Sequence, residues 1–179
     1  MLVIKGVTFV DRVRAQVFAG NGGDGCSSFR REKFIPFGGP DGGDGGHGGS
    51  VYLRGSHDAG SLLDLYYQPL RRAEHGGKGR GKQCNGRCGA DVYVDVPCGT
   101  VVKDYETGEL IGEVIEKGAT LLVAKGGRGG LGNMHFTTST HQAPREFTEG
   151  TPGETRTLLV ELKTMADVGL VGYPNAGKS

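Results

Sequence analysis

Apolar and polar residues alternate along several short stretches of this chain. Near the N-terminus, Val13, Ala15 and Val17 are separated by Arg14 and Gln16, a pattern that predicts a strand with one buried face. Many such stretches joined by tight turns predict a mainly β fold, either a small β-barrel or a sandwich. The further predicted strands are 51–53, 92–96, 101–104, 110–114, 121–124 and 155–163.

Two connecting stretches carry local signals of their own. Residues 61–66 have an apolar spacing that suits either a strand or a single helical turn, and Pro69 ends the element. The pattern does not separate these alternatives. Residues 105–109 join two predicted strands, and Gly108 suits the left-handed position of a hairpin loop.

Glycine-rich runs between the strands fit neither a helix nor a strand. In residues 38–50 the glycines recur every third position in two registers. This is the period of polyproline II, whose rise would give the run a reach of roughly 40 Å, and the missing side chains would let extended backbones approach and hydrogen-bond. Asp41, Asp44 and His47 are regularly spaced, unlike the residues of Gly/Ser linkers, so a bundle is favoured over a flexible linker. Similar runs lie at 20–25, 76–89 and 126–130.

Composition and charge narrow the functional classes. The chain has 179 residues, 35 of them glycine, and a formal net charge of +1. Its charges are segregated, because residues 71–87 are mostly basic and residues 91–116 mostly acidic. This arrangement suits a polyanion partner at one end of the molecule, or simply two solvated faces of a neutral protein.

Targeting and metal signals are weak. Charged residues interrupt the N-terminal apolar stretch, which excludes a signal peptide, and no apolar run reaches membrane-spanning length. The four cysteines lack paired CxxC spacing. Cys84 and Cys88 could bind zinc together with His75, but reduced thiols in the cytoplasm are the stronger expectation.

The last residues carry the most specific local motif. Residues 168–171 read as a short buried strand that leads directly into the pattern G-x-x-x-x-G-K-[ST], the phosphate loop of nucleotide-binding proteins. In such a loop backbone N–H groups cradle the phosphates, Lys178 reaches the β- and γ-phosphates, and the Ser179 hydroxyl ligates Mg²⁺. The predicted nucleotide-binding residues are Gly172, Tyr173, Pro174, Asn175, Ala176, Gly177, Lys178 and Ser179.

This motif also predicts the domain organisation. Residues 1–166 form one domain, and residues 167–179 are the start of a truncated α/β nucleotide-binding domain. A second metal-binding Asp, a water-positioning group and a base-reading motif would lie beyond the last residue. We therefore assign no catalytic residue within the chain and expect no hydrolysis from these 179 residues alone.

Together these motifs resemble the Obg (CgtA) family of bacterial GTPases in order and spacing. The resemblance implies an N-terminal Obg domain, in which six glycine-rich polyproline-II helices lie on a β-barrel, followed by a GTPase domain. One departure is Gln142, which stands where the family usually has an arginine. The matching stretches are 9–34, 38–51, 61–65, 91–104, 124–133 and 161–179.

The same resemblance implies a function. Proteins of this family act in assembly of the large ribosomal subunit, bind GTP or GDP with Mg²⁺, and hydrolyse GTP slowly. They are linked to the stringent response through guanosine tetraphosphate, and their Obg domain is understood to enter the peptidyl-transferase region in the manner of a transfer RNA. We therefore expect a cytoplasmic, monomeric, rRNA-binding factor whose release is controlled by GTP hydrolysis.

Basic residues in or beside the glycine runs are the candidate rRNA contacts. They would neutralise phosphates rather than read bases, while neighbouring aromatic side chains could stack on splayed bases. Two alternatives stay open: a non-enzymatic module that binds RNA or stress-response proteins, and a metabolic ATPase or kinase that uses the same phosphate loop. The candidate contacts are Arg30, Arg31, Lys33, Arg71, Arg72, Lys78, Arg80, Lys82, Arg87, Lys125 and Arg128.

Overall fold

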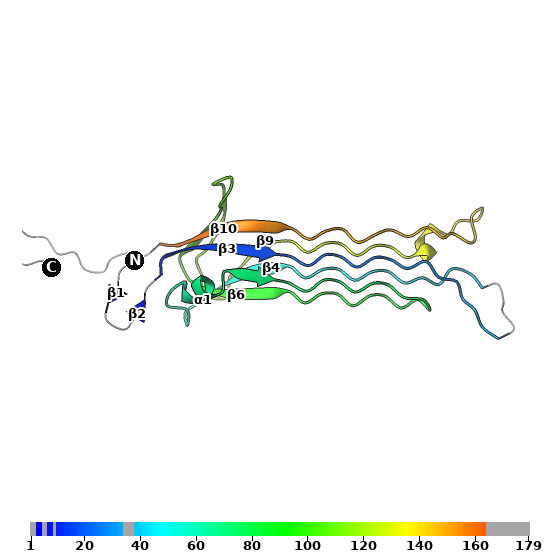
Figure 1. Ribbon diagram of the computed structural model, residues 1–179, viewed down its shortest axis with the longest axis horizontal. Helices are drawn as coiled ribbons and strands as arrows, with labels where there is room; N and C mark the ends of the chain where they lie inside the picture. The colour runs from blue at the N-terminus through cyan, green and yellow to red at the C-terminus, as the bar shows by residue number, and fades with distance from the viewer. Residues whose placement is uncertain (1–2, 5–6, 9, 34–37, 164–179) are drawn as a thin grey trace, which may run out of the picture.

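The structure, a computed structural model, describes residues 3–4, 7–8, 10–33 and 38–163. A body of β-sheets lies at one end, and a long shaft of extended chain runs from it to a distant tip (Figure 1). The predicted strand at 168–171, the phosphate loop and the domain boundary after residue 166 lie outside the described residues.

Two sheets form the body, which confirms the mainly β prediction. The larger has the strand order β5-β3-β10-β7-β8, and the smaller has the order β6-β4-β9. A separate short hairpin pairs β1 with β2. The elements are β1 (Val3–Ile4), β2 (Val7–Thr8), β3 (Arg12–Phe18), β4 (Val51–Ser56), α1 (Leu63–Tyr67), β5 (Leu70–Arg72), β6 (Val92–Pro97), β7 (Thr100–Asp104), β8 (Leu110–Val114), β9 (Thr120–Ala124), the 3₁₀ turn η1 (Asn133–Phe136) and β10 (Thr155–Leu162).

The alternating pattern predicts the buried face of the larger sheet correctly. β3 and β10 pair antiparallel, with Val13 opposite Val160 and Ala15 opposite Leu158. All four side chains are buried in one apolar core that also includes Leu53 of the smaller sheet. The two sheets thus enclose a small core beside the base of the shaft.

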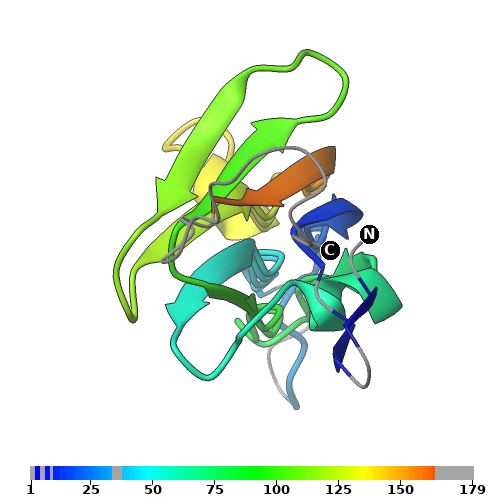
Figure 2. The same cartoon turned by 90° about the vertical axis from the view of Figure 1, so that its left-hand side faces the viewer.

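The two connecting stretches also have definite structures. Residues 63–67 form the helical turn α1, which settles the alternative between a strand and a turn, and Leu65 is its buried residue. Gly108 has a φ of +72° in the loop between β7 and β8, as predicted. Figure 2 shows this yellow-green hairpin projecting from one side of the body.

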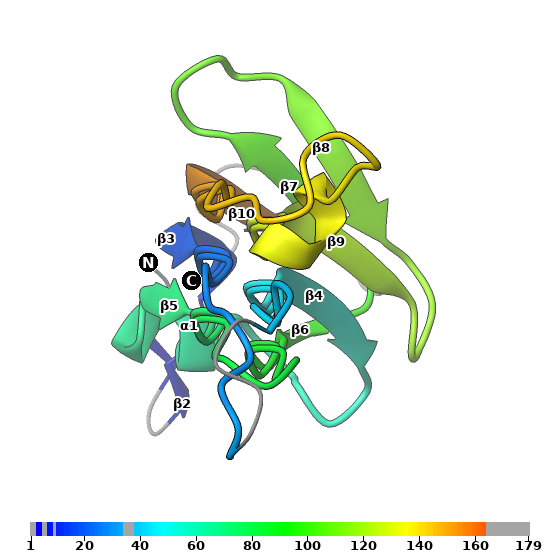
Figure 3. The same cartoon turned by 90° about the vertical axis from the view of Figure 1, so that its right-hand side faces the viewer.

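The shaft consists of glycine-rich segments that lie side by side. End-on they appear as three-sided coils (Figure 3), the outline expected for polyproline II with three residues per turn. We number the six hydrogen-bonded segments of the described chain in sequence order. They are residues 19–28, 39–50, 73–80, 84–91, 125–132 and 148–154.

Backbone hydrogen bonds join the segments at every third residue. The Gly20 N–H donates to Gly49 O and the Gly23 N–H donates to Gly46 O, both at 2.8 Å, which links segments 1 and 2. The Gly46 N–H in turn donates to Gly77 O of segment 3 at 2.9 Å. Segments 1 and 2 each bond to four others and therefore form the centre of the bundle.

These contacts are close enough to require glycine. A Cβ added to Gly45 would lie 1.9 Å from Gly23 O, and one added to Gly46 would lie 2.1 Å from Arg87 O. Each neighbour is a backbone atom that is itself held in the bundle, so it cannot move aside cheaply. The regular glycine period is thus a packing requirement, and residues 38–50 are part of a bundle rather than a flexible linker.

Every third position of segment 2 from Asp41 onward carries a polar side chain, and three of these, Asp44, His47 and Ser50, lie beside segment 5. These side chains accept N–H groups of segment 5 that have no backbone carbonyl facing them, which satisfies the donors. This explains the regular spacing of the polar residues within the glycine run. The bonds run from Gly132 to Asp44 Oδ1 (2.7 Å), from Gly129 to His47 Nδ1 (3.0 Å) and from Gly126 to Ser50 Oγ (3.1 Å).

Substitution of Gly45 by alanine should destabilise the shaft. Because the new Cβ would clash with a fixed backbone oxygen, we expect a loss of about 1–3 kcal/mol or more in the free energy of unfolding. The control is Gly39→Ala, in the same register of segment 2, where an added Cβ meets nothing within 4 Å. Urea unfolding followed by circular dichroism should separate the two variants, and equal losses would contradict the close-packing account.

Candidate nucleic-acid interface at the shaft tip

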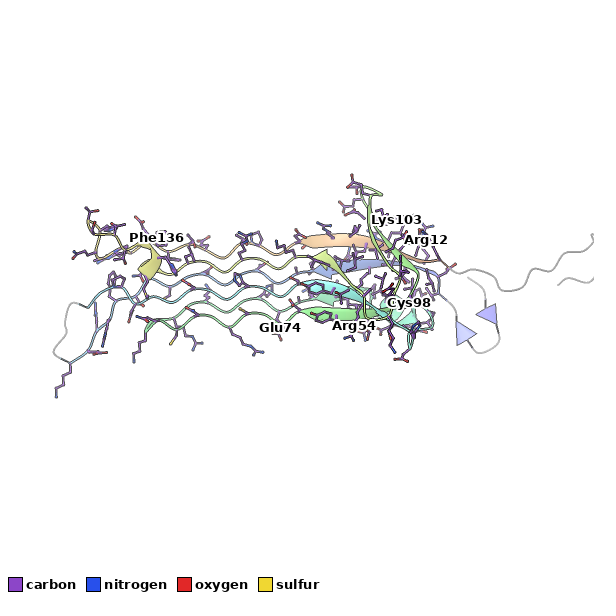
Figure 4. The ribbon with its side chains drawn as sticks, turned by 180° about the vertical axis from the view of Figure 1, so that it is seen from behind. Arg12, Arg54, Glu74, Cys98, Lys103 and Phe136 are labelled. Atoms are coloured by element: carbon purple, nitrogen blue, oxygen red, sulfur yellow. The ribbon has the colours of Figure 1, made fainter. Side chains whose placement is uncertain are left out.

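Three loops meet at the end of the shaft farthest from the sheets. They are residues 29–33 and 38 between segments 1 and 2, residues 81–83 between segments 3 and 4, and residues 133–147 between segments 5 and 6 (Figure 1). Figure 4 shows Phe136 at this tip, whereas Arg54 and Lys103 lie beside the sheets. The tip is thus assembled from parts of the chain that are far apart in sequence.

Arginines from two of these loops line one hollow. A hollow of about 590 Å³ is bordered by Phe29, Arg30 and Arg31 on one side and by Gln142 and Arg145 on the other. Among the described residues, neither Arg31 nor Arg145 forms an ion pair. Their charges are therefore available to a polyanion.

Arg30 differs, because it is already neutralised in part. Its Nε donates to Glu32 Oε1 at 3.0 Å and its Nη2 donates to Glu32 Oε2 at 3.1 Å. This hydrogen-bonded pair raises the pKa of Arg30 and lowers the pKa of Glu32. A second hollow of about 300 Å³ beside this pair is also lined by Arg31 and by Lys82 from the neighbouring loop.

Asp41 fixes two of the loops to each other. It is 7% exposed, and its carboxylate accepts the Ser28 hydroxyl and the Lys82 N–H, the latter at 3.2 Å. Its backbone carbonyl accepts the Gln83 N–H at 2.7 Å. Lys82 and Gln83 both adopt positive φ angles, 60° and 59°, so Asp41 holds an unfavourable turn in place.

Asn133 fixes the third loop. Its side chain is fully buried, and Nδ2 donates to Ser28 O at 2.9 Å and to Pro144 O at 3.0 Å. Oδ1 accepts the Gly42 N–H at 2.9 Å. One amide therefore saturates three backbone groups from three parts of the chain, and the tip is held as one unit.

Several of the predicted contacts lie along the shaft instead of at its tip. Lys78 of segment 3 binds Asp24 of segment 1, with 2.9 Å between Nζ and Oδ2. This hydrogen bond raises the pKa of Lys78, and together with the Gly150 N–H it lowers the pKa of Asp24. Lys78 also lines a hollow of about 650 Å³ with Arg80 and Arg87. Arg128 belongs to segment 5.

Three of the predicted contacts lie near the sheets. Arg71 of β5 is bound to Asp64 of α1, with 2.7 Å between Nη2 and Oδ2. Arg72 lies over the Phe18 ring, 4.9 Å from its centre, and Lys125 directly follows β9. The basic run at 71–87 thus extends from the body to the tip and back, and its charges are not all brought together.

Sequence reasoning overlooked the residues that organise the tip. In the sequence, Asp41 stands out only by its regular spacing. Asn133 stands out only as the residue after a glycine-rich run, and no feature marks Arg145. The sequence does carry one signal for Asn133: it is the polar residue that directly follows the glycine run of segment 5. The location of Arg145 beside Arg31 depends on contacts between distant loops, which no local pattern indicates.

The described ranges offer little for a metal site or a membrane span. There, no three His, Cys, Asp or Glu side chains are grouped so as to hold a metal ion, and the four cysteines are free thiols. No helix in the described part of the chain is long and apolar enough to cross a membrane.

The sequence model of the GTP1/OBG family matches residues 10–164. This match covers both the β-sheet body and the whole glycine shaft. The chain belongs to the GTP1/OBG family. Membership of the GTP1/OBG family confirms the resemblance drawn from the motifs and associates the chain with GTP-binding, ribosome-related proteins. The match ends before residues 172–179, for which the phosphate loop stays a prediction.

The acid sensitivity of the shaft should depend on Asp24. Its pKa is lowered in the folded state, so its contribution to stability is present at neutral pH and is lost as the pH falls through that folded-state value. Asp24→Asn cannot titrate, and its melting temperature should therefore fall less between pH 7 and pH 3 than that of the unmodified chain. Asp58→Asn, at an exposed position, should keep the original pH dependence. The same fall in all three proteins would refute the assignment.

Removal of the Asn133 side chain should loosen the tip. Asn133→Ala leaves two buried backbone groups, the Gly42 N–H and the Pro144 carbonyl, without the partner that Asn133 supplied, whereas Ser28 O still accepts the Asp41 N–H. Each unsatisfied group costs about 1–3 kcal/mol. Amide exchange should become faster at Gly42 and in the loop around Pro144. Asn85→Ala, which removes one exposed acceptor of the Asp44 N–H, is the control and should have a smaller effect. Unchanged exchange at Gly42 would show that Asn133 does not hold the tip.

Proposed function

We propose that this protein docks the tip of its glycine shaft into an rRNA cleft of the large ribosomal subunit, near the peptidyl-transferase region, during subunit assembly. The observation that carries the proposal is the hollow between Arg31 and Arg145, two arginines without ion pairs on loops that Asp41 and Asn133 hold together. Guanidinium groups suit phosphate because they present several donors in a planar fork.

The shape of the shaft supports the same proposal. A bundle of extended segments reaches roughly 40 Å and carries its side chains on the outside (Figure 4). It can therefore enter a narrow space that a globular surface cannot. Because the tip loops are fixed before binding, little conformational entropy is lost on docking.

A nucleotide switch completes the proposal. In the full-length protein the backbone of residues 172–177 would cradle the phosphates of GTP or GDP, Lys178 would contact the β- and γ-phosphates, and Ser179 would ligate Mg²⁺. GTP binding would favour the docked state, and hydrolysis would release the factor. Guanosine tetraphosphate, which shares the guanine and the 5′-diphosphate, would compete for the same loop and link docking to the stringent response.

Co-sedimentation with large ribosomal subunits tests the docking step. The double charge reversal Arg31→Glu and Arg145→Glu should weaken binding of the full-length protein at least tenfold. It should also reduce the slope of log affinity against log salt by roughly 0.7–0.9 for each lost phosphate contact. The control is Lys117→Glu, an exposed reversal in the turn between β8 and β9, which should leave binding unchanged.

Two other results would favour the alternatives. If binding persisted in the double reversal and after RNase treatment, the shaft would be a protein-docking module rather than an rRNA probe. If ATP displaced a fluorescent guanine nucleotide from the full-length protein as well as GTP does, the switch would belong to an ATPase or kinase.

A further inference from the structure

The tip turn at residues 81–83 separates two hollows with different chemistry. Lys82 lines the hollow of about 300 Å³ that it shares with Arg30 and Arg31. Gln83, the next residue, lines a hollow of about 230 Å³ on the other side, together with Asn85 and His135. The larger hollow carries three cationic side chains beside the carboxylates of Glu32 and Asp41. The smaller one offers amide and imidazole groups beside the Asp44 carboxylate, whose oxygens already bind the Gly132 N–H and the His135 ring.

The backbone of this turn is strained at Lys82 and Gln83, the two residues that line the two hollows. Lys82 and Gln83 have φ angles of 60° and 59°, a region that side-chain-bearing residues rarely adopt and that glycine adopts freely. Such conformations persist only where the surroundings impose them, and they concentrate at functional sites. Asp41 imposes this one by accepting the N–H groups of both residues.

The smaller hollow presents free donors and acceptors. The Gln83 amide forms no hydrogen bond with a described side chain, so both its oxygen and its nitrogen are available. Toward the described residues, Asn85 uses only Oδ1, which accepts the Asp44 N–H, and His135 uses only Nε2, which lies 3.0 Å from Asp44 Oδ2. Met134, 37% exposed, adds an apolar wall.

We infer that this smaller hollow, centred on Gln83, binds the base of one unstacked RNA nucleotide whose phosphate lies against Lys82 and Arg31. Proteins recognise RNA sequence mainly through splayed bases, by hydrogen bonds to their edges, and amide side chains suit such edges. The hollow is smaller than the 300–1,000 Å³ of drug-sized sites, which fits one base. The inference rests on the proposed rRNA docking and adds base selectivity to it.

Binding to four RNA hairpins tests the inference. The hairpins share one stem and carry six-nucleotide loops of A, C, G or U, and fluorescence anisotropy measures their affinity for the 179-residue chain at several salt concentrations. One good base contact should separate the best loop from the worst by roughly 5- to 100-fold.

Two glycine variants distinguish the base contact of Gln83 from the phosphate contact of Lys82. Gln83→Gly should bind all four loops equally, with the salt slope of the unmodified chain. Because glycine relieves the positive φ, its melting temperature should not fall, and misfolding cannot account for the lost preference. Lys82→Gly should lower the affinity for all four loops by the same factor and keep their order of preference. It should also reduce the salt slope by about 0.7, because one phosphate contact is lost.

Two results would overturn the inference while rRNA docking stands. The first is equal affinity of the unmodified chain for all four loops. The second is a loop preference that survives in Gln83→Gly. If the chain bound none of the hairpins and the full-length protein also failed to bind large subunits, docking and base selectivity would both be wrong.

Discussion

The structure depends on hydrogen bonds between glycine-rich backbones that recur at every third residue. At most glycines of the bundle two segments lie closer than a Cβ allows: a Cβ added to Gly45, for example, would lie 1.9 Å from Gly23 O. The interior of the shaft is therefore mainly peptide backbone, and most side chains of the segments point outward, whereas Asp41 and Asn133 are buried at the tip. This separates packing from surface chemistry, since residues on the outward register can carry charges or hydrogen-bonding groups without disturbing the interior.

Side chains on the outer positions of the inner segments also help to hold the bundle together. Side chains of the inner segments accept further N–H groups of the outer ones. Asp44 and His47 bind N–H groups of segment 5, and Asp24 accepts the Gly150 N–H of segment 6 at 3.1 Å. Asp41 and Asn133 extend the same principle to the tip, where they bind loop backbones. The proposed contacts with RNA thus stand on a scaffold whose donors are already satisfied.

Local patterns in the sequence predicted the local structure well. Alternation identified β3 and β10 because only one face of each is buried, and the glycine period identified the shaft because it reports a packing requirement. The period could not predict which segments are neighbours, since all glycine registers look alike. The meeting of Arg31 with Arg145, and the separation of Arg71 from the tip, depend on how the chain turns, which no single stretch encodes. The α1 stretch was ambiguous because five residues are too short for periodicity to decide.

The two ends of the molecule differ in what they bury. The sheet body buries valine and leucine side chains, and water's response to apolar surface makes such burial weaken on cooling. The shaft buries mainly peptide groups, whose exposure lowers rather than raises the heat capacity of unfolding. The shaft therefore lacks the apolar contribution that weakens on cooling, and in the cold the body would give way first while the shaft kept its shape.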